Sequence, residues 1–317
     1  MAYTGINKHT DYFNTKLYTG NGSVRTETGV GFQPDMVWIK DRTGTNNNEI
    51  HDSIRGANYQ IYTNLNNAET NAGGHLTAFA SDGFTLGTDG ATNTNSSNYV
   101  AWNWKAGTTG SGTTSGSGTS KSYSYSVNTT AGFSIVSYTG NGTGGHAIPH
   151  HLGAVPSMVI LKQRDAVGDT LVYHHKNTSD PKTDFLRLKS SNATQDEAAI
   201  WNDTAPTSTY FYVGSETTVN GNNNTFIAYC FTEKTGYSKF GHYRGNGSND
   251  GTFVYTGFKP SVVIVKAQQT ADNWTMYDNK RAGYNTLNYF LYPNLSNAED
   301  TSNAQWFDIF SNGFQIR

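Results

Sequence analysis

The sequence predicts an all-β protein of tandem antiparallel β-sandwich domains, and three observations carry this prediction. Gly, Tyr, Phe, Asn, Thr and Ser are abundant, whereas charged residues make up only 15% of the 317 residues. This composition is typical of turns and short strands. Short apolar runs with turn residues on both sides recur along the chain. One arrangement of such runs occurs three times, and no convincing long helix pattern appears.

The repeated arrangement begins with a Tyr-x-Gly-Asn-Gly motif, found at residues 18–22, 138–142 and 243–247. Downstream of each copy, a proline precedes an apolar run that ends at a lysine, at residues 34–40, 156–162 and 260–266. Because these runs are rich in β-branched side chains and bounded by turn signals, we expect strands buried on both faces. The matching offsets indicate duplicated domains of about 100 residues.

These boundaries divide the chain into four segments. We predict a β-sandwich repeat at 1–107, a Gly/Ser/Thr linker at 108–121, a second β-sandwich repeat at 122–236 and a third repeat at 237–317. The linker composition is typical of a flexible coil, so repeat one is expected to move relative to the rest. The short join near residue 235 is expected to keep repeats two and three in contact.

Each sandwich is expected to be of the immunoglobulin or jelly-roll type, with about seven short strands and turn residues between them. The nearest helix candidate is Asn192–Ala199. The last strand of each complete repeat has alternating large side chains, which should share one face. These are Val100, Trp102 and Trp104 in repeat one and Ile227, Tyr229 and Phe231 in repeat two.

The third repeat is predicted to lack this closing strand. The interval from Phe84 to Tyr99 equals that from Phe211 to Phe226, and the same interval counted from Phe314 runs past Arg317. Either the natural chain continues, or a strand from another subunit completes the sheet by β-augmentation. The first explanation is preferred because no spare strand is evident at the N-terminus. Until it is filled, such a domain exposes unpaired backbone groups and an apolar groove.

Several motifs together resemble the repeat of structural proteins of marine tailed bacteriophages. They are YTGNG, GFQPDMVWIK, Asp52-Ser53-Ile54-Arg55-Gly56, the segment 65–69, SDGFTLG and YVAWNWKAG. The resemblance covers nearly the whole chain and implies concanavalin A/LamG-like sandwiches in a tail fibre, spike-like or capsid decoration protein. Repeat two departs from the pattern, with His150 where the family usually has glycine and His174-His175-Lys176 in place of the Asp-Ser-x-Arg element.

We therefore expect a bacteriophage virion surface or appendage protein that contacts other virion subunits and, in host attachment, host surface glycans. The alternative is a glycan-binding lectin or a polysaccharide-degrading tail spike. A homo-oligomer is expected, with a trimer as the leading guess. A formal net charge of −2 without basic clusters argues against nucleic-acid binding. The sequence has no signal peptide or apolar run that fits a membrane span, so we expect synthesis in the host cytoplasm and release by lysis.

Catalysis is not expected. Glycan cleavage needs two carboxylates across a cleft, and Asp52, Asp82 and Glu69 are the best candidates in repeat one. The position of Asp52 is occupied by His174 and Asp278 in the other repeats, and that of Asp82 by Asn312. Such substitution is more typical of binders or spacers. There is also no nucleophile-elbow motif.

No cofactor or metal is expected, although some residues suit one. The histidines concentrate in repeat two, at positions 146, 150, 151, 174 and 175, where surface loops are the expected setting. Turns at 46–49, 92–98 and 220–224 offer oxygen ligands for Ca²⁺, but turn formation explains them equally well. Cys230 lies in an apolar run and is expected in the core, as are Trp38, Trp102 and Trp104. Trp274 has polar neighbours and is the better candidate for stacking on a sugar, although a core position is favoured there too.

Overall fold

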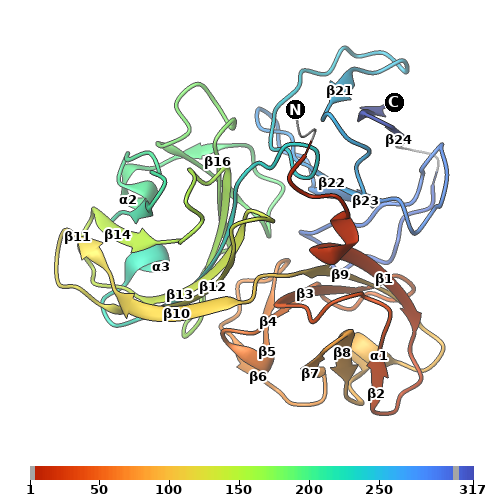
Figure 1. Cartoon of the computed structure of the whole chain (residues 1–317). Coiled ribbons are helices and arrows are strands. Elements are labelled where there is room, and N and C mark those ends of the chain that lie inside the picture. Colours follow the sequence, from red (N-terminus) through yellow and green to blue (C-terminus); the bar gives the residue numbers. More distant parts are fainter. Residues whose placement is uncertain (1–3, 303–306) are drawn as a thin grey trace.

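The computed structural model describes residues 4–302 and 307–317, and its described part is built of antiparallel sheets with only short helical turns. Three lobes lie around a common centre, one for each sequence repeat (Figure 1). Repeat one lies at the bottom of that view, repeat two at the left and repeat three at the upper right. The predicted fold class, an all-β protein of tandem antiparallel sandwiches, is confirmed.

Repeat one is a sandwich of two sheets with the strand orders β1-β9-β3-β4-β5-β6 and β2-β8-β7. Its elements are η1 (His9–Asp11), β1 (Phe13–Thr19), β2 (Arg25–Glu27), β3 (Met36–Asp41), β4 (Glu49–Asp52), β5 (Gly56–Tyr62), β6 (Thr70–Asn71), β7 (Leu76–Ala80), β8 (Gly83–Leu86), α1 (Gly90–Asn93) and β9 (Asn98–Trp104). Between the sheets, Val37 and Tyr99 of the large sheet pack in one cluster with Leu76 and Phe84 of the small one.

Repeat two has the same plan, with strand orders β10-β12-β13-β20-β15-β16-β17-β18 and β11-β14-β19. Its elements are β10 (Thr108–Thr113), β11 (Ser115–Gly116), β12 (Ser122–Asn128), β13 (Phe133–Thr139), β14 (His146–Pro149), β15 (Met158–Gln163), β16 (Leu171–His174), β17 (Asp184–Arg187), β18 (Gln195–Asp196), α2 (Ala198–Trp201), β19 (Tyr210–Val213), α3 (Thr217–Asn220) and β20 (Thr225–Phe231). The nearest helix candidate, Asn192–Ala199, includes the short strand β18, which pairs with β17, and only its last two residues belong to the short helix α2.

The segment 108–121 is not a flexible linker, and that prediction is wrong. Residues 108–113 form β10, which pairs with β12 along its whole length, and β11 pairs with β14. Gly110 and Gly112 lie directly opposite Tyr125 and Tyr123, and each glycine lies against the ring of its opposite tyrosine. Glycine has no side chain to obstruct a cross-strand ring, so the composition suits a strand covered by aromatics.

The described part of repeat three has fewer strands than the other repeats. Its elements are β21 (Phe253–Tyr255), β22 (Val262–Val265), β23 (Thr275–Asp278), β24 (Phe307–Phe310) and β25 (Gly313–Ile316). They form the sheets β22-β23 and β21-β25-β24. The closing strand β9 lies between β1 and β3, and β20 lies between β13 and β15. Among the described residues, β22 has a neighbouring strand only on the side of β23, and its four residues are partly exposed whereas β3 is buried throughout.

The Tyr-x-Gly-Asn-Gly motif attaches β1 to the turn that precedes the closing strand. The Tyr18 hydroxyl donates to the Thr92 carbonyl at 2.8 Å, and the Asn21 N–H donates to Oδ1 of Asn93 at 2.9 Å. Repeat two repeats both bonds, from Tyr138 to the carbonyl of Val219 and from Asn141 to Asn220. In repeat three, residues 243–247 are all exposed.

Replacing Gly20 by alanine is expected to lower the free energy of unfolding by about 2 kcal/mol or more. A Cβ atom at this position would lie 2.2 Å from the Thr94 carbonyl oxygen, so the turn must move. Gly245, the matching glycine of repeat three, has nothing within 4 Å of such an atom. Gly245→Ala is therefore the matched control, expected to change stability by less than about 0.5 kcal/mol. Equal denaturant midpoints for the two variants would contradict this account.

Candidate functional site

The three repeats pack their large sheets against one another around a shared core. Val100 and Trp102 of β9 belong to the same buried cluster as Ile227 and Tyr229 of β20 and Met276 of β23. The expected alternation is confirmed, since the intervening residues of β9 and β20 face their own sandwich interiors. The apolar runs of repeats one and two are therefore buried on both faces, one against the sandwich and one against the other repeats.

Equivalent backbone hydrogen bonds join the repeats into a closed ring. The loop after β5 of repeat one, the matching loop of repeat two and the matching loop of repeat three each donate to the next repeat. The three bonds are Glu69 N–H to Arg164 O at 2.6 Å, Thr194 N–H to Gln268 O at 2.9 Å, and Glu299 N–H to Arg42 O at 2.8 Å. The ring thus runs from repeat one to two, two to three and three back to one. A head-to-tail contact that closes in this way has approximate threefold symmetry.

The lysine that ends each apolar run makes a second set of equivalent contacts. Lys40 Nζ donates to the Ser296 carbonyl at 3.1 Å, Lys162 Nζ to Asn66 at 3.4 Å and Lys266 Nζ to Ser191 at 3.1 Å. Burial lowers the pKa of Lys40 and of Lys162 to about 8. Backbone carbonyls satisfy these buried amines, so the lysines act as connectors between repeats.

A buried ion network joins repeats one and two. Arg55 Nε lies 2.5 Å from Asp52 Oδ2, and its Nη1 lies 3.0 Å from Glu69. Glu69 also pairs with Arg164 at 2.8 Å, and the Tyr229 hydroxyl donates to Asp52 at 2.6 Å. Burial alone would lower the pKa of Arg55, but the negative charge of Asp52 raises it. The guanidinium is therefore permanently charged.

The same network joins repeats three and one. Arg281 pairs with Asp278 at 2.6 Å and with Glu299 at 3.0 Å, and Glu299 pairs with Arg42 at 2.7 Å. Trp102 Nε1 donates to Asp278 at 3.2 Å, in the place where Tyr229 contacts Asp52. The same arrangement of charged and aromatic residues therefore occurs at two junctions of the ring.

The junction of repeats two and three has other residues at the positions of these carboxylates. Thr194 stands where the other loops have glutamate, and its hydroxyl donates to Oδ1 of Asn177 at 2.8 Å. His174 replaces the aspartate, and its ring centre lies 6.3 Å from that of Phe240. The predicted contact between repeats two and three is confirmed. The expected mobility of repeat one is wrong, because it shares a buried core and ion pairs with both other repeats.

An open depression of about 480 Å³ marks the point where the three loops meet. Its walls come from all three repeats and are rich in side-chain amides. The lining residues are Asn64, Leu65, Asn66, Lys189, Ser190, Ser191, Asn273, Asn294 and Leu295. This depression was not predicted from the sequence, in which its signal is the recurrence of a Leu-x-Asn-Ala-Glu segment at 65–69 and 295–299.

The structure brings two of the three candidate carboxylates together and separates the third. Asp52 and Glu69 both bind Arg55, and both are almost fully buried. Asp82 is exposed and accepts backbone N–H bonds from Gly29 and Gly31, which lower its pKa. The pair at Arg55 is therefore occupied in joining repeats, and Asp82 anchors a loop. Neither arrangement has the two free carboxylates that glycan cleavage requires.

The histidines of repeat two do not form one site. His146 and His150 are buried, so the expectation of surface loops is wrong for them. His146 bonds Asn220 and Thr114, and His151 stacks on Tyr125 with ring centres 3.6 Å apart. His146 and His151 are thus engaged in the packing of repeat two.

Repeat two is expected to lose stability in acid because of His150. Its Nε2 bonds the Thr207 carbonyl and its Nδ1 accepts from the Leu152 N–H, which fits the neutral ring. Burial lowers its pKa from 6.5 to about 4. The unfolded chain therefore takes up the proton first, and the free energy of unfolding falls as the pH drops from about 6.5 to about 4.

We expect a loss of about 2 kcal/mol between pH 7 and pH 4.5 from this group alone. Denaturant titrations at the two pH values should show a smaller difference for His150→Gln than for the unchanged protein. An identical pH dependence for both proteins would contradict the assignment.

The turns considered for Ca²⁺ use their side-chain oxygens within the fold. Asn48 Oδ1 accepts from Trp38 Nε1, and Asn93 and Asn220 hold the glycine motifs. Glu49 is bound by His51 and His75, at 3.3 and 3.0 Å, a buried polar cluster that sequence reasoning missed. Within residues 4–302 and 307–317 no group of three or more His, Cys, Asp or Glu side chains is placed to hold a metal.

Trp274 is buried and does not offer a sugar-stacking surface. Its side chain is 6% exposed, belongs to the shared core and donates from Nε1 to the Arg187 carbonyl at 3.0 Å. The predicted core position of Cys230, Trp38 and Trp102 is confirmed, and burial raises the pKa of the Cys230 thiol.

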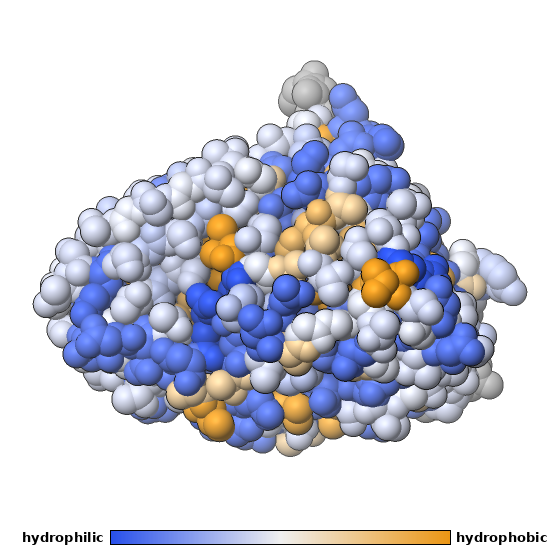
Figure 2. Space-filling model, turned by 90° about the horizontal axis from the view of Figure 1, so that it is seen from below, coloured by the Kyte–Doolittle hydropathy of each residue, from blue (hydrophilic) through white to orange (hydrophobic). Residues whose placement is uncertain are grey.

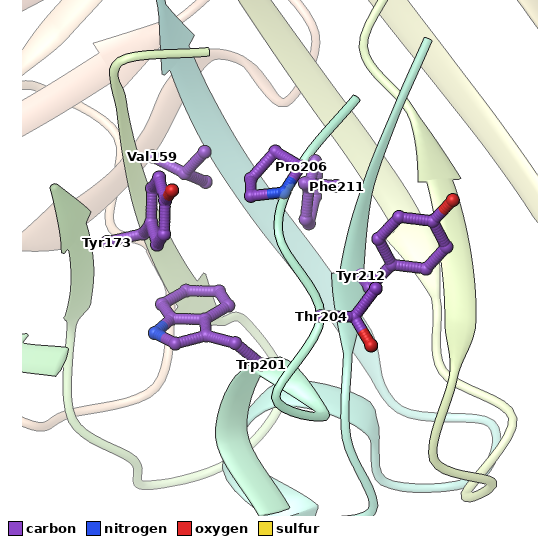
Figure 3. A pocket seen from close by; sticks show the side chains of 7 residues that line it. All are labelled: Val159, Tyr173, Trp201, Thr204, Pro206, Phe211 and Tyr212. Atoms are coloured by element: carbon purple, nitrogen blue, oxygen red, sulfur yellow. The ribbon is translucent and has the colours of Figure 1, made fainter. Parts of the chain in front are cut away.

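An aromatic crevice on repeat two is the other hollow of note. It lies between β15, β16 and the segment from α2 to β19, with Tyr173, Trp201 and Phe211 among its walls (Figure 3). It is too narrow to admit a water molecule. The crevice is therefore part of the packing of repeat two and has no room for a ligand.

Comparison with known proteins gives one match. A family model described as a domain of unknown function, DUF7483, matches residues 8–317. The chain belongs to the DUF7483 family. No curated protein and no solved structure matches it. One DUF7483 match therefore spans all three repeats, in agreement with their closed ring. Among the described residues, none of the helices has the length and apolar character to cross a bilayer.

Proposed function

We propose that the protein is a non-enzymatic structural component of a bacteriophage virion, a fibre or decoration protein exposed on the particle. The observation that carries the proposal is the closed ring of three sandwiches. Its buried ion pairs at Arg55 and Arg281 and its shared aromatic core join the repeats. These residues therefore make the arrangement of the three repeats rigid. The resemblance of the motifs to virion repeats supports a location on the virion, after synthesis in the host cytoplasm and release by lysis.

The surface supports a role in contacts with other virion subunits. The face seen in Figure 2 has small hydrophobic groups separated by hydrophilic residues. Scattered groups of this kind are normal on a soluble surface and do not resemble a large obligate interface. Contacts that neighbouring subunits make with this face are thus expected to be polar. The depression at the centre of the ring is the place proposed for a host glycan, because its amide side chains are suited to hydroxyl groups.

A homo-oligomer, with a trimer as the leading guess, remains part of the proposal. The head-to-tail contacts between repeats close within one chain, so association of chains must use other surfaces. Light scattering of the purified protein at micromolar concentration tests this. A stable monomer at that concentration would count against self-assembly.

The virion role is tested by fractionation of purified particles, combined with glycan-array screening of the isolated protein. We expect the chain in particles at a fixed stoichiometry and without activity on polysaccharides. A protein that is absent from particles but degrades a polysaccharide would overturn the proposal. In the alternative of a free lectin, glycan binding would occur at the central depression and would be abolished by the double substitution Asn66→Ala, Ser191→Ala.

A further inference from the structure

Repeat three leaves open the strand position that is filled in both other repeats. β3 pairs with β9 over residues 36–41, and β15 pairs with β20 over residues 158–163. The corresponding edge of β22 has no partner strand among the described residues. Its side chains Val262 and Ile264 pack against the shared core but are only partly buried. An unpaired edge beside partly exposed apolar side chains is a template for another strand.

A second, independent feature of repeat three is open in the same way. In repeats one and two the Tyr-x-Gly-Asn-Gly motif is covered by the turn before the closing strand. A Cβ atom on Gly20 or Gly140 would lie 2.2 or 2.4 Å from a carbonyl oxygen of that turn. A Cβ atom on Gly245 of repeat three would have no described neighbour within 4 Å, and Tyr243 is 37% exposed whereas Tyr18 is 7% exposed. The Tyr-x-Gly-Asn-Gly motif is present in repeat three, but among the described residues no such turn covers it.

We propose that the open side of repeat three is an acceptor groove for a polypeptide segment of defined chemistry. The segment begins with a short helical turn that contains an asparagine, which would bind the backbone of residues 244–247. It continues as an antiparallel strand between β22 and the segment 238–244. The strand has an aromatic residue, a β-branched residue, alanine, then two further aromatic residues separated by a small or polar one.

The registers in the complete repeats determine where these side chains would lie. Trp102 lies opposite Trp38 in β3, and Tyr229 lies opposite Ile160 in β15. Each of them contacts the aspartate of a neighbouring repeat. The equivalent aromatic of the bound segment would lie opposite Ile264 and against His174 of repeat two. His174 is now next to Phe240, whose ring would be one wall of the filled groove.

Pairing of β22 with β22 of a second copy does not satisfy both features. Such a dimer would cover the strand edge but would leave residues 243–247 exposed. A turn-and-strand segment covers both at once, as it does in repeats one and two. The occupant is therefore such a segment and not a second copy. The inference goes beyond the proposed virion role and does not depend on it.

The test uses the protein of residues 1–317 and a synthetic peptide with the sequence of residues 87–105. Calorimetry is expected to show binding of one peptide per chain. Hydrogen exchange at the backbone amides of residues 261–266 is expected to slow when the peptide is bound. A peptide with alanine in place of Asn93 is expected to bind at least about tenfold more weakly, because the asparagine side chain accepts an N–H of the motif.

Gly245→Ala separates the groove from nonspecific binding. This variant is expected to have unchanged stability alone, because the position is empty, but to bind the peptide about tenfold more weakly. Equal binding by the unchanged protein and the variant would overturn the proposal. Peptide binding without slower hydrogen exchange at residues 261–266 would also overturn the proposal, since the peptide would then have replaced a strand of another repeat.

A fusion removes any difficulty of peptide solubility. Residues 88–105 are attached directly after Arg317, and a scrambled version of the same residues is the control. The authentic fusion is expected to protect the amides at 261–266 and to raise the midpoint of thermal unfolding relative to the scrambled one. No difference between the two fusions, together with no peptide binding, would refute the acceptor groove. Dimers that form equally in both fusions would assign the edge to a second copy instead.

Discussion

Replacement of Arg55 by alanine is expected to lower the free energy of unfolding by about 3–5 kcal/mol. The guanidinium and its partner Asp52 are both fully buried, and Arg55 also contacts Glu69. Removal of the positive charge leaves a buried carboxylate without its counter-ion, which costs more than the pair contributes by itself. Chemical denaturation followed by intrinsic tryptophan fluorescence measures the change.

Two comparisons make the Arg55 result specific. Lys182 forms an exposed ion pair with Asp180, so Lys182→Ala should change stability by less than about 1 kcal/mol. The double variant Asp52→Asn, Arg55→Met removes both charges and is expected to recover part of the loss, because no unpaired charge stays buried. Equal destabilisation by Arg55→Ala and Lys182→Ala would show that the network does not join repeats one and two.

Replacement of Trp102 by alanine is expected to cost about 3–5 kcal/mol and to separate the unfolding of the repeats. The indole is fully buried in the shared core, and its Nε1 donates to Asp278 of repeat three. The cavity and the lost hydrogen bond both weaken the contact between repeats one and three. Calorimetry should show one thermal transition for the unchanged protein and two for the variant.

The control for Trp102 is an exposed aromatic residue. Tyr284 is 83% exposed, so Tyr284→Ala should alter the unfolding free energy by less than about 0.5 kcal/mol. A variant at Trp102 that still unfolds in one transition at nearly the original temperature would argue that the shared core does not couple the repeats.

Much of the fold follows from local patterns in the sequence. The apolar runs ending at Lys40 and Lys162 are strands buried on both faces, and alternation in β9 places Val100 and Trp102 on one face. Both follow from the two-residue period of a strand and its turn signals.

The composition of 108–121 shows where local patterns are insufficient. Gly, Ser and Thr favour flexibility in isolation, but here a free sheet edge and the rings of Tyr123 and Tyr125 are available to pair with the segment. That partner lies elsewhere in the chain, and composition does not report it. The same reason explains Trp274, whose polar sequence neighbours suggested exposure although the packing of other repeats buries it.

The sequence by itself determined the number of repeats, the strands formed by the apolar runs and the face that each closing strand presents. Only the tertiary structure decided what covers that face. The ring closes through bonds such as Glu299 to Arg42, which lie far apart in the chain. The tertiary structure also makes Asp52 and Glu69 the ion-pair partners of Arg55. The two-residue period of a strand tells which side chains lie on the same face. Whether that face is buried against a distant repeat depends on the shapes of both surfaces, which no local pattern contains.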